Sequence, residues 1–133
     1  MAEMSQSFRR AFEFVISPQV EGEYSLDPKD PGNWTGGKQD AGELKGTKFG
    51  ISAAAYPQLD IGSLRWEDAR EIYWRDYWMA PGFEQLPPRV AFVVFDAAVN
   101  QGVSVAVKLL QRTVNVDEDG VIGPVTRAAV QQT

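Results

Sequence analysis

Apolar residues recur every three or four positions at the start of the chain and predict an amphipathic helix over residues 5–17. Charged side chains fill the positions between them, as expected for a helix with one buried face. Pro18 then interrupts the pattern, and it either ends this helix or starts a further short turn. The apolar positions of the helix are Phe8, Ala11, Phe12, Val15 and Ile16.

Residues 22–48 show no helical period and are rich in glycine and Asp-Pro pairs, which is turn chemistry. We expect a mostly irregular segment with room for a short hairpin. Loops of this length in a small domain are usually functional or disordered. Tyr24 and Trp34 favour a functional loop, because disordered linkers are poor in aromatic residues.

The rest of the chain reads as helices separated by proline and glycine. The run AFVVFDAAV is almost unbroken in its apolar character and predicts a central buried helix. The pattern therefore predicts a mainly α fold with one small irregular or β-hairpin lobe. The expected helices cover 53–56 after a Ser52 cap, 64–78 after a Ser63 cap, 89–101, 103–114, and a last segment that begins at Pro124.

Composition removes several classes of function. The 133 residues suit one domain, and 13 Lys and Arg against 18 Asp and Glu give a net charge of −5. An acidic chain is a poor partner for nucleic acid or an anionic membrane. It holds no cysteine and no histidine, which excludes thiol or histidine catalysis and the metal sites built on these residues. Acid/base chemistry must then use Asp, Glu, Lys or Tyr.

The acidic stretch after the first helix is the best candidate for that chemistry. A carboxyl group at a helix end, partly covered by apolar neighbours, can have a raised pKa and donate a proton. A second, ionised carboxylate across a cleft completes the equipment for splitting a glycosidic bond. Glu21 and Asp30 stand nine residues apart, a separation that a returning loop can close. The plain alternative is that these residues are solvated turn formers.

Eight short motifs follow one another along the chain. They are EGEY at 21–24, DP at 27–28, DPG at 30–32, TKFGIS at 47–52, WRDYW at 74–78, FDAAVNQG at 95–102, LQR at 110–112 and DGVIGPVT at 119–126. Ordered motifs are far more specific than any one alone. In this order they resemble the phage-type N-acetylmuramidases with a Glu-Gly-Gly-Tyr signature, glycoside hydrolase family 108. The resemblance runs from about residue 8 to 130, and its last motif is also similar to small peptidoglycan-binding helical modules.

The resemblance implies a single lysozyme-like domain over 1–133, with a catalytic lobe at 5–86 and a helical part at 87–133 like a peptidoglycan-binding module. It implies cleavage of peptidoglycan between N-acetylmuramic acid and N-acetylglucosamine. By this carry-over Glu21 is the general acid and Asp30 the second carboxylate, with Asp27 as its competitor. The hydroxyl of Thr47 would orient the attacking water, since a hydroxyl both donates and accepts.

Three features depart from the family pattern. Glu23 replaces the usual Gly, and its charge can raise the pKa of Glu21. Pro18 lies where relatives continue the first helix into the catalytic Glu. Residues 33–46 look like an insertion, which either extends the substrate lip or forms a solvated surface loop.

Tyr24, Trp34 and Asn100 are the candidate substrate-binding residues, with Trp34 as a platform for sugar stacking. Asn100 and Asp96 stand four apart on the apolar helix. Either they are buried and hold a loop in place, or Asn100 faces the cleft and contacts an N-acetyl group. The aromatic residues at 73, 74, 77 and 78 have helical spacing, which favours packing in the core for most of them.

We therefore predict a monomeric peptidoglycan hydrolase that needs no metal or organic cofactor and has glycan strands as its partner. No signal peptide or membrane-spanning run is recognised, so we expect synthesis in a bacterial cytoplasm and action in the periplasm or wall, by a phage or phage-like route. The main alternative is an inactive wall-binding or structural module of a phage-like particle. A second is an enzyme on a related polymer such as chitin.

Overall fold

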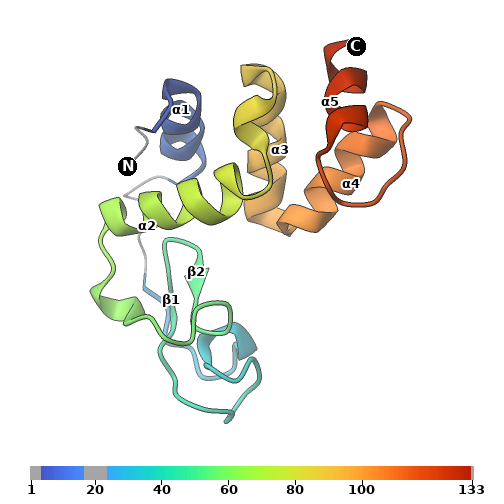
Figure 1. Cartoon of the computed structure of the whole chain (residues 1–133). Helices are drawn as coiled ribbons and strands as arrows, with labels where there is room; N and C mark the ends of the chain where they lie inside the picture. Colours follow the sequence, from blue (N-terminus) through green and yellow to red (C-terminus); the bar gives the residue numbers. More distant parts are fainter. Residues whose placement is uncertain (1–3, 17–23, 133) are drawn as a thin grey trace. The chain divides into compact units, whose positions relative to one another are not determined.

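The computed structural model describes residues 4–16 and 24–132, which form helices and one small antiparallel sheet (Figure 1). The chain divides into two compact units. A helical unit comprises Met1–Val15 and Glu71–Thr133, and a loop-rich unit comprises Ile16–Arg70. The fold is mainly α, as the sequence pattern predicts.

The helical unit is built around α3 (Pro88–Gln101), which packs against both α1 (Gln6–Val15) and α4 (Val103–Thr113) (Figure 1). Gly102 joins α3 to α4 with a φ of 101°, a conformation that favours glycine. The last helix, α5 (Pro124–Gln131), starts with proline in its first turn. These helices confirm the sequence prediction within one or two residues at most ends.

Aromatic rings form the core of this unit. Phe8 on α1 is fully buried, and its ring centroid lies 5.4 Å from that of Trp78 and 5.8 Å from that of Phe95. Tyr73 is also buried, with its ring 6.1 Å from that of Phe95. The prediction that most of the aromatic residues at 73–78 pack in the core is confirmed for Tyr73 and Trp78.

The predicted helix over 64–78 differs from the structure at both ends. It begins as α2 (Trp66–Ile72) and continues as a π-helical segment, η3 (Tyr73–Met79). Ser63 does not cap it, because its hydroxyl donates to Asp60; the carboxylate of Asp68 instead accepts the backbone N–H of Arg65 at 2.9 Å. The wider π turn, with residues five apart hydrogen-bonded, lets Tyr73 and Trp78 face the same core.

The apolar run on α3 is not buried all round. Ala91, Val94, Phe95 and Ala98 form its buried stripe, whereas Val93 is 65% exposed. The prediction of a central buried helix is therefore confirmed for this stripe and wrong for Val93, and α3 is central to its unit. A short 3₁₀ segment, η4 (Phe83–Gln85), precedes it.

The loop-rich unit contains a short antiparallel hairpin of β1 (Thr47–Lys48) and β2 (Ile51–Ser52), in which Thr47 pairs with Ser52. Its two-residue turn has positive φ at Phe49 and Gly50, the geometry that matches strand twist. The predicted helix at 53–56 is wrong: Ser52 lies in β2, and its hydroxyl caps only a turn by accepting the N–H of Ala55. The unit also contains two 3₁₀ segments, η1 (Pro31–Asn33) and η2 (Ile61–Ser63).

Within the part of the chain that the structure describes, no helix is long and apolar enough to cross a membrane.

Candidate active site

The centre of the loop-rich unit is a buried asparagine. The side chain of Asn33 has no exposed surface, and its Nδ2 donates to the carbonyl of Asp27 at 3.0 Å and to the hydroxyl of Ser25 at 3.3 Å. The backbone carbonyl of Asn33 accepts hydrogen bonds from the backbone N–H groups of Lys45 and Gly46, both at 3.0 Å. One residue thus joins the loop at 25–30 to the segment that enters the hairpin.

Thr47 lies on the other side of this amide. Its hydroxyl donates to Oδ1 of Asn33 at 2.6 Å. Its backbone pairs with that of Ser25 through two hydrogen bonds of 2.9 and 3.0 Å. Thr47 is half-buried, and the proton of its hydroxyl is held by Asn33.

The two candidate second carboxylates are exposed and lie in one loop. Oδ1 of Asp30 accepts the N–H of Gly32 at 2.9 Å and caps η1, while Oδ1 of Asp27 accepts the N–H of Lys29 at 3.0 Å. Each carboxylate therefore shapes its own turn through one oxygen. The N–H of Asp30 also donates to the carbonyl of Asp27, at 3.2 Å, which is the carbonyl that Asn33 holds.

The aromatic candidates are anchored by their polar atoms. Nε1 of Trp34 donates to the carbonyl of Pro28 at 2.9 Å, and the ring is half-buried. The hydroxyl of Tyr24 donates to the carbonyl of Lys45 at 2.8 Å, and the residue is 43% exposed. Trp34 therefore offers a ligand its ring, and Tyr24 offers its ring and the lone pairs of its hydroxyl oxygen.

The other predicted site residues lie either outside the described part of the chain or in the helical unit. Glu21, Pro18 and Glu23 lie outside the described residues. Asn100 belongs to the helical unit, where it is exposed and its Nδ2 donates to the carbonyl and the carboxylate of Asp96 on the same helix. The interpretation of Asn100 as a buried residue that holds a loop is therefore wrong.

The segment at 33–46 is an ordered loop. An isolated β-bridge pairs Trp34 with Leu44, and the hydroxyl of Thr35 accepts the N–H of Glu43 at 2.9 Å. Its tip, including Lys38 and Asp40, is exposed. The segment thus combines an anchored base that carries Trp34 with a solvated tip.

The DGVIGPVT motif after α4 is organised by Gln111. This side chain is 1% exposed; its Nε2 donates to Asp119 at 2.8 Å and to Thr126 at 3.1 Å, and its Oε1 accepts the N–H of Gly120 at 3.0 Å. Together with the N–H of Val121, this amide lowers the pKa of Asp119. These contacts make the motif a structural turn that leads into α5.

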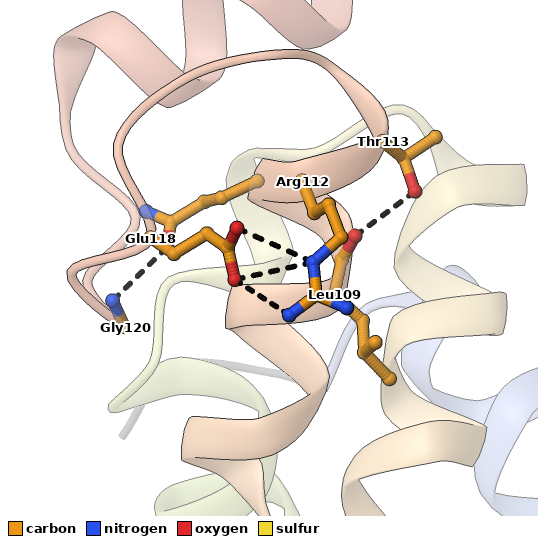
Figure 2. A network of polar contacts seen from close by, with 6 residues as sticks. Leu109, Arg112, Thr113, Glu118 and Gly120 are labelled. Atoms are coloured by element: carbon orange, nitrogen blue, oxygen red, sulfur yellow. Dashed lines mark hydrogen bonds and ion pairs between the residues drawn. The ribbon is translucent and has the colours of Figure 1, made fainter.

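An exposed ion pair supports the same turn. Figure 2 shows the guanidinium of Arg112 facing the carboxylate of Glu118, with Nη2 and Oε1 2.9 Å apart. The hydrogen bonds from Arg112 lower the pKa of Glu118. Surface pairs of this kind contribute little stability on their own.

The mainly α fold, with two exposed carboxylates, a hydroxyl and two aromatic rings in one unit, has the kinds of group that a glycoside hydrolase uses. Residues 14–102 match the model of the family described as glycosyl hydrolase 108, so the chain belongs to that family. A solved structure, that of Brucella abortus SagA, is similar: the identity is 35%, the TM-score is 0.74, and the match covers 96% of this chain and 70% of that one. Among curated proteins no match is found. The resemblance drawn from the motifs is confirmed, as is the mainly α, lysozyme-like fold.

Proposed function

We propose that the chain is a peptidoglycan hydrolase that cleaves the bond between N-acetylmuramic acid and N-acetylglucosamine by carboxylate acid/base catalysis. Membership of glycosyl hydrolase family 108 supports glycoside hydrolysis of peptidoglycan. The observation that carries the proposal further is the Asn33 cluster, which ties Thr47 to the backbone of the loop that bears Asp27 and Asp30. All of these residues lie within the region matched by the family.

In this proposal Glu21 gives its proton to the oxygen that links the two sugars. The bond between that oxygen and the anomeric carbon breaks, and the oxygen of a water molecule forms a bond to the same carbon. A carboxylate, proposed to be Asp30, accepts the proton that this water loses. One water is consumed, and one new reducing end and one new hydroxyl are released. Asp27 is the competing base, because it is also exposed and lies in the same loop.

Substrate contacts follow from which atoms remain free. Tyr24 and Trp34 have committed their donors to backbone carbonyls, so their rings are proposed to stack on the apolar faces of sugars. The Nδ2 group of Asn100 is bonded to Asp96, so its Oδ1 is the atom proposed to accept the N–H of an acetamido group.

The proposed setting is the bacterial cell wall, with a monomer acting on glycan strands and no metal or organic cofactor. A phage or phage-like origin and export route belong to the same proposal. The net charge of −5 gives this setting a measurable consequence. An acidic enzyme is repelled by an anionic wall, so its rate on sacculi should rise when salt screens the repulsion.

The test is release of reducing ends from purified sacculi by the wild type, Glu21→Gln and Glu13→Gln. Glu13 is an exposed carboxylate of α1 that the mechanism does not use, so its variant is the matched control. We expect wild type and Glu13→Gln to be equally active, and folded Glu21→Gln to lose at least 100-fold, because general acid catalysis contributes that much. An inactive wild type that still binds sacculi would establish the wall-binding module instead.

A further inference from the structure

We infer that Asn33 is a positioning residue that sets the direction of the Thr47 hydroxyl, so that this hydroxyl receives a hydrogen bond from the attacking water. The inference rests on the proposed function and adds a residue to it. Nothing in the sequence indicates this role, since an Asn after Pro-Gly is typical of an ordinary turn.

The orientation of the Asn33 amide is fixed by its neighbours. The carbonyl oxygen of Asp27 can only accept a hydrogen bond, so the atom of Asn33 that lies 3.0 Å from it must be the NH₂ group. The other amide atom, 2.6 Å from the Thr47 hydroxyl, is then the oxygen, which can only accept. The Thr47 proton must therefore point at Asn33.

Burial makes this arrangement persistent. Asn33 has no exposed surface, so solvent does not compete for its Oδ1, and its own carbonyl is held by Lys45 and Gly46. With its proton engaged, the Thr47 hydroxyl has only lone pairs left for a ligand. A water bound there must donate a proton to Thr47, which leaves a lone pair of that water for the anomeric carbon and its second proton for a carboxylate.

The side-chain amide of Asn33 also connects Thr47 to the turn that bears Asp30, the proposed base. The carbonyl of Asp27 accepts both Nδ2 of Asn33 and the backbone N–H of Asp30. One buried side chain thus fixes the water-orienting hydroxyl on one side and the turn that bears Asp30 on the other. Without Asn33 the Thr47 hydroxyl can turn to another staggered position and donate to the water, which points it the wrong way.

The test is a set of double variants assayed for kcat and KM on solubilised, uncrosslinked glycan strands. Thr47→Val removes the hydroxyl and Thr47→Ser keeps it. We expect Asn33→Ala to lower kcat about 10-fold in the wild type and in Thr47→Ser, with KM nearly unchanged. In the Thr47→Val background we expect Asn33→Ala to cause less than a 2-fold further loss, because no hydroxyl remains to be directed. Thr113→Val, which removes an exposed hydroxyl on α4 that the mechanism does not use, is the control and should keep wild-type kcat.

If the role of Asn33 is purely structural, Asn33→Ala will lower kcat by the same factor whether residue 47 carries a hydroxyl or is valine. That result overturns the inference. If Asn33→Ala loses its cooperative unfolding transition, Asn33→Asp, which keeps an acceptor for Thr47, replaces it in the same cycle. It should retain more kcat than Thr47→Val; a loss as large in the Thr47→Val background as in the wild type overturns the inference. The proposed function fails separately, and takes the inference with it, if wild type releases no ends or Glu21→Gln is fully active.

Discussion

Gly46 stands directly before Thr47, and its replacement by alanine tests whether the geometry of the cluster matters. Its φ is 91°, in the region that side chains rarely adopt. A Cβ there would clash with the carbonyl oxygen of Ser25 and would lie 2.7 Å from the Tyr24 ring. Moving the Ser25 backbone away costs free energy, because it disrupts the β-bridge between Ser25 and Thr47. We therefore expect Gly46→Ala to push this bridge apart.

Gly37 supplies the matched control, because its φ is 79° but a Cβ there meets nothing within 4 Å. Gly37→Ala therefore adds only the conformational cost of a left-handed residue, about 1–2 kcal/mol. Gly46→Ala adds the steric term, about 1–3 kcal/mol for overpacking, which gives roughly 2–5 kcal/mol in total. At about 4 °C per kcal/mol for a chain of this size, Tm should fall by roughly 4–8 °C and 8–20 °C respectively.

The assay pairs thermal unfolding, followed by circular dichroism, with release of reducing ends at a temperature where both variants are folded. Gly46→Ala should lose at least 10-fold in rate, since the Thr47 hydroxyl moves, whereas Gly37→Ala should stay within 2-fold of wild type. Equal Tm shifts and equal activity for the two variants would refute the reasoning that the close approach at Gly46 shapes the site.

Three further predictions concern the carboxylates and the C-terminal turn. Asp30→Asn should lower kcat at least 100-fold and Asp27→Asn less than 10-fold, measured on glycan strands; the reverse order would make Asp27 the base. Gln111→Leu should reduce the free energy of unfolding in urea by about 2–4 kcal/mol, because it leaves Thr126 without its buried partner; a loss under 1 kcal/mol would contradict this. The folded pKa of Asp119 is below its unfolded value, so its stabilisation is present above about pH 4 and is lost as the pH falls through the folded pKa. Asp119→Asn should therefore flatten the fall of Tm between about pH 5 and 2.5, and an unchanged slope would count against the Gln111 contacts.

The helices were the predictable part of the fold. Local signals in the sequence mark them. Apolar residues such as Phe8 and Phe12 recur at helical spacing, Gly102 separates two helices and Pro124 starts the last one, and the structure has helices at these places. The π-helical turn at Tyr73–Met79 was not predictable, because it depends on packing against α1 and α3 and not on the propensities of its own residues. Ser52 also shows the limit of local signals. Its hydroxyl accepts a backbone N–H as a cap does, but it caps a turn that follows a strand and not a helix.

The types of residue in the candidate site were predictable from the sequence, but the hydrogen bonds that connect them were not. Asp30 and Thr47 stand out because they match a family motif, and chemistry restricts which side chains can move protons. Asn33 carries no such mark, since its importance comes from the carbonyl of Asp27 and the hydroxyl of Thr47, which only the folded chain brings to it. Asn100 was proposed for the same cleft, and the structure describes only its contacts with Asp96.

The measurement that bears most directly on the central claim is mass spectrometry of the fragments that wild type and Glu21→Gln release from sacculi. Wild type should yield fragments whose reducing sugar is N-acetylmuramic acid, and folded Glu21→Gln should yield almost none. Fragments ending in N-acetylglucosamine, or the same products from both proteins, would contradict the account.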